Sequence, residues 1–410
     1  MTGFATKAIH NYSAKATEHG TLRVPVYDSV AFAYADAESM QLAFEGKRPT
    51  HSYSRISNPT VTALEQKVQE LSKGLSVIAF SSGMAAISTT ILGVAGAGDN
   101  IVISKYLFGN TLSLFCKTLA PWGLKVKMVD ITDLGALENA IDDNTRAVFI
   151  ESISNPQMQV PDVSGIASIT QDKKVLLIMD NTVTTPYLFN TKEAGVDLEV
   201  ISSTKYMSGG ATCVGGLLID NGSYNWKHNP KLSTAAQKYG PFTFIASLRQ
   251  EVFRNLGTCM APHNAYLQLL GIESMTLRID KSCSNAQALA ECIDKLPGVQ
   301  DVFYPGLPSS PYYEIAKKQF GGLFGGILTF ALSSKEKCFR MVNALQIIKR
   351  ATNINDNKSL IIHPASTIFC EYGHDELLEI GVTDNLLRLS VGIEDVDDLI
   401  KDLKQALEAC

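Results

Sequence analysis

The sequence lacks the features that mark several large classes of protein. Eight cysteines are scattered without a CxxC pair and without histidines at zinc-ligand spacing, so we expect reduced thiols and no metal site. No stretch approaches the roughly 20 apolar residues of a membrane span, and the opening MTGFATKAIHNYSAK lacks the apolar centre of a signal peptide. We therefore expect a cytoplasmic protein.

Basic charge and nucleotide-binding motifs are also lacking. The formal net charge of -5 provides no basic field for phosphate, which argues against nucleic acid as a partner and favours small molecules or proteins. No GxGxxG follows a predicted strand, and neither GxxxxGKS nor GxxxxGKT occurs. Dinucleotide-binding and P-loop enzymes therefore lose their main support.

What is present is a chain of 410 residues, 45% hydrophobic and 19% charged, which is long enough for two domains. From residue 76 to 220, short β-branched runs alternate with longer helical patterns, which predicts a parallel sheet with crossover helices. Several runs are apolar on both faces, as buried parallel strands are. The predicted strands are Ser76-Phe80, Asn100-Ser104, Lys125-Asp130, Arg146-Glu151, Val175-Asp180, Glu199-Ser202 and Cys213-Ile219.

The chain is predicted to have three parts. Residues 1–60 form a loop-rich arm, which we expect to contact a neighbouring subunit. Residues 61–260 form the α/β domain. Residues 261–410 form a smaller α+β domain, which contains a long helical pattern over 264–296, the segments GGILTFAL and LLRLSVG, and a final amphipathic helix over 396–407.

Ligands bind at the carboxyl ends of the strands in an open parallel sheet, and three loops at such ends carry unusual side chains. In FSSGMAAIST the strand is predicted to end at Phe80 and a helix to open at Ala85. Between them Ser81, Ser82 and Gly83 offer hydroxyls and free N–H groups to a phosphate. Serine acting only as a helix N-cap explains the same residues.

Asp180 and Lys205 follow two further predicted strands. The aspartate in LLIMDNTVTTPY can hold a cationic nitrogen, although Asp-Asn-Thr also suits a turn. The lysine in SSTKYMSGG suits Schiff-base chemistry, although an isolated loop lysine is more often a surface residue. A cofactor with a phosphate, a pyridine nitrogen and an aldehyde uses all three loops, which predicts pyridoxal 5'-phosphate (PLP).

The chain resembles the Cys/Met-metabolism family of PLP-dependent enzymes over nearly its whole length. The motifs that carry the resemblance are, in order, YSRISNPT, SSGMAA, LFGNT, ESISNP, MDNT, SSTKY, IHPAS and LLRLSVGIED. The resemblance implies the aspartate aminotransferase-like fold of PLP-dependent transferases (fold type I), with a mainly parallel sheet in the large domain. It also implies a homotetramer built from dimers that share active sites.

The resemblance implies a role for each residue that matches a motif. Lys205 would hold the cofactor as a Schiff base and act as the general base, and Asp180 would pair with the pyridine nitrogen. Arg388 would bind the substrate carboxylate as a bidentate fork, with Asn353 nearby. The residues expected around the ring and phosphate of the cofactor are Phe108, Asn155, Ser82, Gly83, Met84, Ser202 and Thr204, with Tyr53 and Arg55 of a neighbouring subunit.

Two positions depart from the family pattern. Phe108 in LFG stands where the family usually has tyrosine, so the stacking ring is kept and its hydroxyl, which is held to assist proton transfer, is lost. Tyr106 is a candidate to replace that hydroxyl. Ile153 stands where relatives commonly have proline, and we assign it no function.

The segment GPFTFIASLRQEVFRNLGTCMAPHNAYLQLLGIESMTLR resembles the O-acetylhomoserine sulfhydrylase branch, and Asn353 stands where the lyases tend to have serine. This favours γ-replacement on O-acetylhomoserine, in which a sulfur nucleophile displaces acetate and homocysteine is released. The alternatives are methionine or cystathionine γ-lyase activity, or γ-synthase activity, in the same family. The sulfur donor stays open between sulfide, methanethiol and a thiocarboxylate carrier protein, as does the choice of acetyl, succinyl or phospho ester.

Overall fold

The protein is described by a computed structural model that covers residues 3–10, 19–48 and 50–409. Its larger sheet has the seven strands that the sequence predicts, within a few residues at each end. Across the sheet they run in the order β1 (Ser76–Phe80), β7 (Gly216–Asp220), β6 (Leu198–Ile201), β5 (Leu176–Asp180), β4 (Thr145–Glu151), β2 (Asn100–Ser104) and β3 (Lys125–Val129).

The sheet is mainly parallel, with one exception. Strands β6, β5, β4, β2 and β3 pair in parallel, whereas β7 pairs antiparallel with both β6 and β1. The predicted mainly parallel sheet is therefore confirmed, with β7 as its antiparallel strand. Strand β7 begins at Gly216 rather than at the predicted Cys213. Since β7 reverses the direction twice, β1 points the same way as β6, and their carboxyl ends share one edge.

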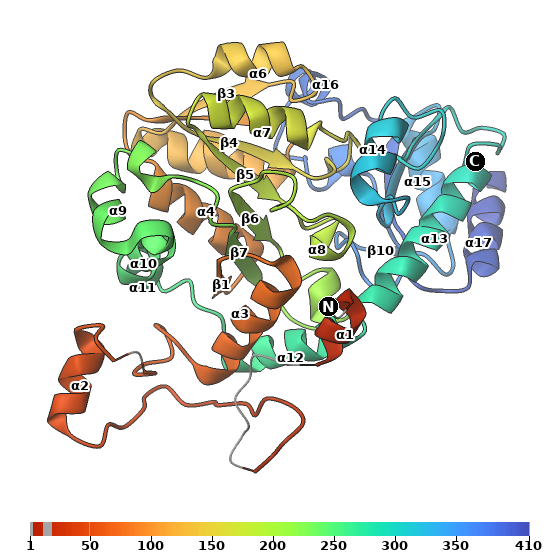
Figure 1. Ribbon diagram of the computed structural model, residues 1–410. Helices are drawn as coiled ribbons and strands as arrows, with labels where there is room; N and C mark the ends of the chain where they lie inside the picture. Colours follow the sequence, from red (N-terminus) through yellow and green to blue (C-terminus); the bar gives the residue numbers. More distant parts are fainter. Residues whose placement is uncertain (1–2, 11–18, 49, 410) are drawn as a thin grey trace.

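Helices cover both faces of the larger sheet (Figure 1). Val148 and Ile150 of β4 belong to the apolar core that includes α7 (Val163–Asp172), while Ala147 and Phe149 belong to the core that includes α4 (Gly83–Val94). Successive side chains of a strand point to opposite faces, so a strand covered on both sides needs an uninterrupted apolar run. The uninterrupted apolar runs in the sequence therefore mark these strands.

The C-terminal part contains a five-stranded sheet in the order β10 (Lys349–Arg350), β11 (Leu360–Ile362), β12 (Leu386–Ser390), β9 (Ile327–Ala331) and β8 (Asp301–Phe303). The segments GGILTFAL and LLRLSVG supply the central strands β9 and β12, which are fully buried. The last helix, α17 (Val396–Glu408), packs against α13 (Met275–Ile293) and α15 (Lys335–Ala344).

The long helical pattern is two helices, α12 (Pro262–Glu273) and α13, with a break at Ser274. Arg278 is buried at the break, where its guanidinium donates to the carbonyl of Gly271 at 2.7 Å and to Ser274 Oγ at 3.1 Å. Helix α12 packs on α3 (Pro59–Ser72), whereas α13 contacts β8 and β9. We therefore propose that the boundary between the two main domains lies at this break rather than near residue 260.

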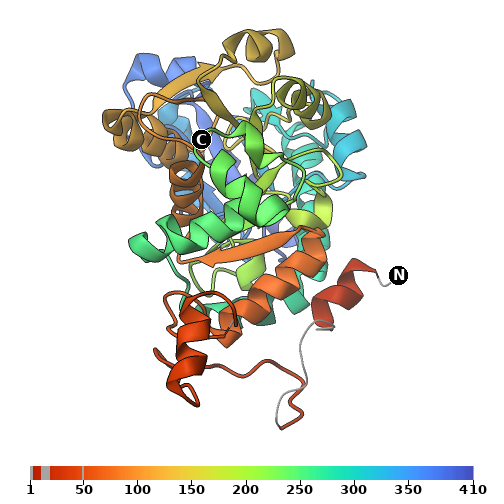
Figure 2. The same ribbon diagram turned by 60° about the vertical axis from the view of Figure 1, so that its left-hand side comes forward.

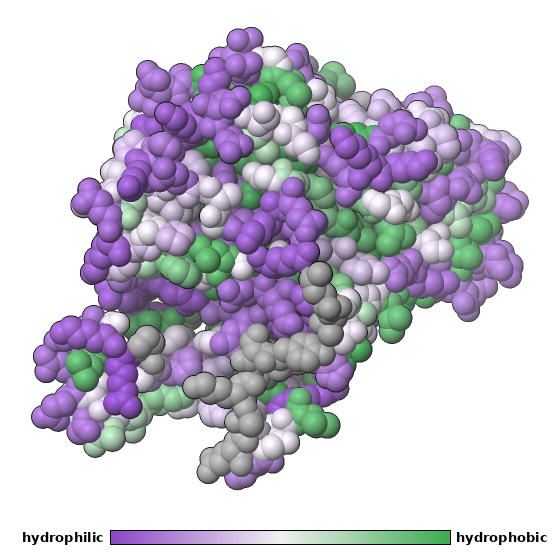
Figure 3. Space-filling model, viewed as in Figure 1, coloured by the Kyte–Doolittle hydropathy of each residue, from purple (hydrophilic) through white to green (hydrophobic). Residues whose placement is uncertain are grey.

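The N-terminal arm is partly attached to the body of its own chain. Helix α1 (Phe4–Ile9) packs against α3 and α12, whereas the segment around α2 (Ala37–Phe44) lies apart from the two sheets in both ribbon views (Figures 1 and 2). The arm exposes apolar side chains, among them Leu22 (102% exposed), Val30 (61%) and Phe44 (74%). Figure 3 shows hydrophobic patches on its surface. Within the described residues, no helix combines the length and the apolar character needed to span a membrane.

Gly216 supplies a test of how closely the strand ends pack. A Cβ atom at this position would overlap the carbonyl oxygen of Ser82, at the start of the α4 loop. We expect Gly216→Ala to lower the midpoint of thermal unfolding, because backbone must move, at a cost of about 1–3 kcal/mol. Gly96→Ala is the control, since its Cβ would come no closer than 3.7 Å, to Asp99. Equal midpoints for the two variants would contradict this packing.

Candidate active site

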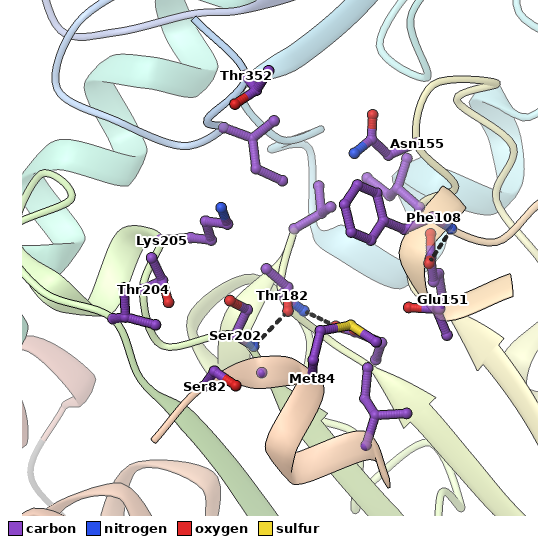
Figure 4. Close-up of a pocket in the computed structure, with 18 of the residues that line it drawn as sticks. Ser82, Met84, Phe108, Glu151, Asn155, Thr182, Ser202, Thr204, Lys205 and Thr352 are labelled. Atoms are coloured by element: carbon purple, nitrogen blue, oxygen red, sulfur yellow. Dashed lines mark hydrogen bonds between the residues drawn. The ribbon is translucent and has the colours of Figure 1, made fainter. Parts of the chain in front are cut away.

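A cavity of about 280 Å³ lies at the carboxyl ends of the strands of the larger sheet and is closed on one side by residues of the smaller sheet. Most of the residues that the sequence singled out line it (Figure 4). They are Ser82, Gly83, Met84, Phe108, Asn155, Asp180, Ser202, Thr204, Lys205 and Arg388. Segments as far apart in the sequence as Ser82 and Arg388 are thus brought to one place by the sheet topology.

The start of helix α4 forms one end of the cavity. The helix begins at Gly83 rather than at Ala85, because Ser82 is its N-cap and accepts the N–H of Ala85 at 3.0 Å. A Cβ on Gly83 would lie 2.7 Å from Cβ of Ser202, so only glycine lets these two segments approach so closely. The first N–H groups of the helix have no partner within the helix, and such groups favour an anion such as phosphate.

The loop after β6 brings two hydroxyl residues to the same end. The backbone N–H of Ser202 donates to Thr182 Oγ1 at 2.7 Å, which fixes the start of the loop. Thr204 Oγ1 donates to the carbonyl of Gly215 at 3.1 Å and accepts the N–H of Gly215 at 3.0 Å. Both side chains line the cavity beside α4.

Asp180 and Glu151 place two buried carboxyl groups side by side. They are register partners at the ends of β5 and β4. Burial raises the pKa of Asp180, and the backbone N–H and hydroxyl of Thr182 oppose this effect. Burial, and then the charge of Asp180, raises the pKa of Glu151 well above its ordinary range. A cationic nitrogen beside Asp180 would keep that carboxylate ionised.

Glu151 was not singled out by the sequence analysis, although it opens the motif ESISNP. Its Oε1 accepts the backbone N–H of Phe108 at 2.7 Å, and this bond fixes the loop that carries the aromatic ring. The ring lines the cavity, and in Figure 4 it lies across the cavity from Lys205. The signal available was a glutamate at the end of a buried strand.

Lys205 follows β6 and reaches into the cavity (Figure 4). Its Nζ donates to Asn353 Oδ1 at 2.6 Å. Burial, and then the charge of Arg388, lowers the pKa of Lys205 to about 8, while Asp356 and Asp180 act in the opposite direction. A sizeable fraction of this amine is therefore neutral near pH 7 to 8, as a nucleophile or base must be.

Arg388 lies in β12 and is 1% exposed. One Nη donates to the backbone carbonyls of Thr352 and Asn353 at 3.0 and 3.2 Å, and the other to Asn155 Oδ1 at 3.3 Å. Its Nε has no partner among the described residues, and burial lowers the pKa of the guanidinium to about 9. A fixed, incompletely paired guanidinium at a cavity wall suits a carboxylate.

Tyr106 does not replace the missing hydroxyl. Its OH donates to Asp130 Oδ2 at 3.1 Å, and the residue does not line the cavity, so that suggestion is wrong. Ile153, to which no function was assigned, contributes to the cavity wall.

Tyr53 and Arg55 lie outside this cavity, on the exposed arm. The Arg55 guanidinium lies 5.5 Å from the centre of the Tyr53 ring and donates to the carbonyl of Arg254 at 2.5 Å. Their role at the cofactor phosphate of a neighbouring subunit stays a prediction.

The cavity fits a group with three different chemical ends. Free helix N–H groups face one end, a buried carboxylate lies beside another, and an amine with a lowered pKa reaches into the space. The ring of Phe108 offers an apolar face between them. These features match the phosphate, the pyridine nitrogen and the aldehyde of PLP.

The profile of the family described as Cys/Met metabolism PLP-dependent enzyme matches residues 5–408. The chain belongs to this family. It is 36% identical to an L-methionine gamma-lyase of Pseudomonas putida, over 100% of this chain and 98% of the relative. It is a PLP-dependent enzyme of sulfur amino-acid metabolism.

Solved structures agree with this assignment. A Campylobacter jejuni protein described as an O-acetylhomoserine (thiol)-lyase superposes with a TM-score of 0.93 and 36% identity. The superposition covers 99% of this chain and 100% of the Campylobacter chain, which carries N'-pyridoxyl-lysine-5'-monophosphate. The O-acetylhomoserine sulfhydrylase of Wolinella succinogenes has a TM-score of 0.78 and 49% identity over 86% of this chain and 99% of its own. The predicted fold type I and the predicted cofactor are thus confirmed.

Each of the main residues that line the cavity would have a separate role in the reaction. When bound, PLP supplies a ring that withdraws electrons from the carbon next to an amino group. Asp180 would keep the ring nitrogen protonated, Phe108 would cover one face of the ring, and Lys205 would take a proton from the substrate and return it. Arg388 would hold the substrate carboxylate so that the reacting bond lies close to Lys205.

Lys205→Ala should abolish the visible absorption band of the purified, PLP-treated enzyme, because no other lysine lines the cavity among the described residues. Lys73→Ala, which removes a surface lysine that pairs with Glu193 at 2.7 Å, should keep the band. A spectrophotometric titration with PLP measures both. Retention of the wild-type band by Lys205→Ala would refute the assignment.

Arg388→Lys should raise KM for the amino-acid substrate about 10- to 100-fold, because one ammonium cannot replace a bidentate fork. The visible band should change little, since the guanidinium is not required to hold the cofactor. Arg350→Lys, on the exposed strand β10, is the matched control. Steady-state kinetics that show an unchanged KM for Arg388→Lys would exclude it as the carboxylate anchor.

Proposed function

We propose that the enzyme catalyses γ-replacement on O-acetylhomoserine, with a sulfur nucleophile displacing acetate to give homocysteine in methionine biosynthesis. Two features support the choice. The chain is similar to the sulfhydrylase of Wolinella succinogenes along most of its length, and the cavity has Phe108 where the family usually has tyrosine.

The main support for this proposal is the phenylalanine at position 108 in the cavity wall. The cavity wall, as far as the structure describes it, contains no tyrosine, histidine or cysteine, the side chains that most readily protonate a leaving group. A carboxylate such as acetate leaves without a proton, since carboxylic acids have pKa values near 4, whereas thiols have pKa values near 8.5 and leave poorly as anions. The site is thus better suited to expel acetate than a thiolate.

The second candidate is γ-elimination, as in a methionine γ-lyase, which would yield 2-oxobutyrate and ammonia. The full-length similarity to the Pseudomonas putida lyase favours it. Glu151, with its raised pKa, lines the cavity and is a carboxylic acid able to protonate a leaving group. Both reactions need the same early steps from Lys205, so they differ only in the fate of the γ-carbon.

A product assay separates the two reactions. The enzyme is incubated with PLP and O-acetylhomoserine, with and without sulfide, and homocysteine and 2-oxobutyrate are measured. Homocysteine formed only with sulfide supports replacement. Predominant 2-oxobutyrate in the presence of excess sulfide would contradict it. The same assay with O-succinyl- and O-phosphohomoserine identifies the ester.

The proposal extends to the sulfur donor and the assembly. Sulfide is the simplest donor, and methanethiol or a thiocarboxylate carrier protein can be compared with it in the same assay. A homotetramer of dimers is supported by the apolar side chains that the arm exposes, since contact with a second copy would bury them. We also propose a cytoplasmic location, where the cysteines stay reduced.

Phe108→Tyr should raise the rate of γ-elimination from methionine at least about tenfold, because a hydroxyl beside the leaving thiolate can act as a general acid. The rate with O-acetylhomoserine should change by less than about threefold, since acetate needs no proton. Phe339→Tyr, at an exposed position, is the control. An equal change for both substrates would show that the hydroxyl does not act on the leaving group.

A further inference from the structure

Lys205 is the first member of a hydrogen-bonded chain that ends at Asp356, behind the cavity wall. Lys205 Nζ donates to Asn353 Oδ1 at 2.6 Å, and Asn353 Nδ2 donates to Asp356 Oδ2 at 3.0 Å. The other oxygen of Asp356 accepts the backbone N–H of Lys358 at 3.2 Å. Asp356 was given no role from the sequence, and it does not line the cavity.

Lys205 and Asp356 determine the orientation of the Asn353 amide that lies between them. An ammonium group can only donate hydrogen bonds, and a carboxylate can only accept them. The amide of Asn353 satisfies both neighbours only with its oxygen toward Lys205 and its NH₂ toward Asp356. With a neutral lysine the opposite orientation would also satisfy Lys205, because a neutral amine has a lone pair.

The backbone around Asn353 is fixed by other contacts. Arg388 Nη2 donates to the carbonyl of Asn353 at 3.2 Å. Asn357 Nδ2 donates to the carbonyl of Gly209 at 2.9 Å, which ties the segment to the loop that carries Lys205. The side-chain amide is therefore the part of Asn353 left to turn, and Asp356 is the group that opposes its turning.

We propose that Asp356 is a positioning residue, which locks the Asn353 amide with its oxygen toward Lys205. In this orientation Lys205 donates one N–H to Asn353 and keeps its lone pair free to accept a proton from the substrate. Without Asp356, the amide can rotate and donate an N–H to that lone pair, which blocks the base. Asp356 thus acts on the reaction through Asn353 and touches no reacting atom.

This proposal does not depend on the choice between replacement and elimination, because Lys205 serves as the base in both. Its failure would therefore leave the proposed function untouched. The charged groups that act on Lys205 are Arg388, Asp180 and Asp356, and Glu151 is the further carboxyl group at the cavity wall.

The first readout uses the enzyme without cofactor. The extent of Lys205 modification by a small amine-reactive reagent is measured by peptide mass spectrometry between pH 6 and 10. Asp356→Asn should move the midpoint to lower pH by about half a unit or more, because an amide N–H donated to the lone pair favours the neutral amine and a negative charge is lost. In the Asn353→Ser background only the loss of charge remains, so the shift should be smaller.

The second readout is a double-mutant cycle on the active enzyme. Asp356→Asn should lower kcat about tenfold and change KM less, because the base and not the carboxylate anchor is affected. In the Asn353→Ser background, where no amide needs orienting, the same substitution should change kcat less than about twofold. Asp301→Asn, at an exposed position on β8, is the control and should match the wild type.

Three results would overturn the proposal. They are an unchanged kcat for Asp356→Asn, an equal loss of kcat in the wild-type and Asn353→Ser backgrounds, and an unchanged pH midpoint for Lys205. Thermal unfolding of each variant shows whether a loss of kcat comes instead from loss of the folded state.

Discussion

Burial of charge at the carboxyl ends of the strands is the constraint on which the site depends. Burial lowers the pKa of Lys205 and Arg388 and raises the pKa of Asp180 and Glu151, so each pKa moves in the direction that favours the neutral group. The charge of Arg388 adds to this effect at Lys205, and the charge of Asp180 adds to it at Glu151. Such charges are costly to bury unless they are paired. A cofactor that gives Asp180 a cationic nitrogen and Lys205 an aldehyde relieves part of this cost.

The same constraint ties the two sheets together. Asp180 ends β5 and Lys205 follows β6 of the larger sheet, whereas Arg388 lies in β12 of the smaller sheet and Asn353 in the loop between β10 and β11. Hydrogen bonds from Asn357 to Gly209 and from Arg388 to Asn155 join the two parts close to Lys205 and Arg388. A shift of one part against the other would therefore change the distance between Lys205 and Arg388.

The sequence was sufficient for the strands and their ends, because runs that are apolar on both faces mark strands covered by helices on both sides. It could not show that β7 runs antiparallel, since hydropathy does not record strand direction. Nor could it place the break at Ser274, because the helical pattern continues across it, and the Arg278 bonds found there are not recorded in that pattern. Glu151 was missed because its partner, Phe108, lies 43 residues away in the sequence. Asp356 was missed because its importance comes from the direction of its side chain, which bonds Asn353 three residues before it, and a sequence does not record that direction.

The features of the site converge on Lys205 as the residue that holds PLP at the carboxyl ends of these strands. The most direct test is borohydride reduction of the PLP-loaded enzyme, followed by proteolysis and mass spectrometry. We expect a pyridoxyl group on the peptide that contains Lys205, at close to one per chain. A pyridoxyl group found mainly on another lysine, or on none, would contradict it.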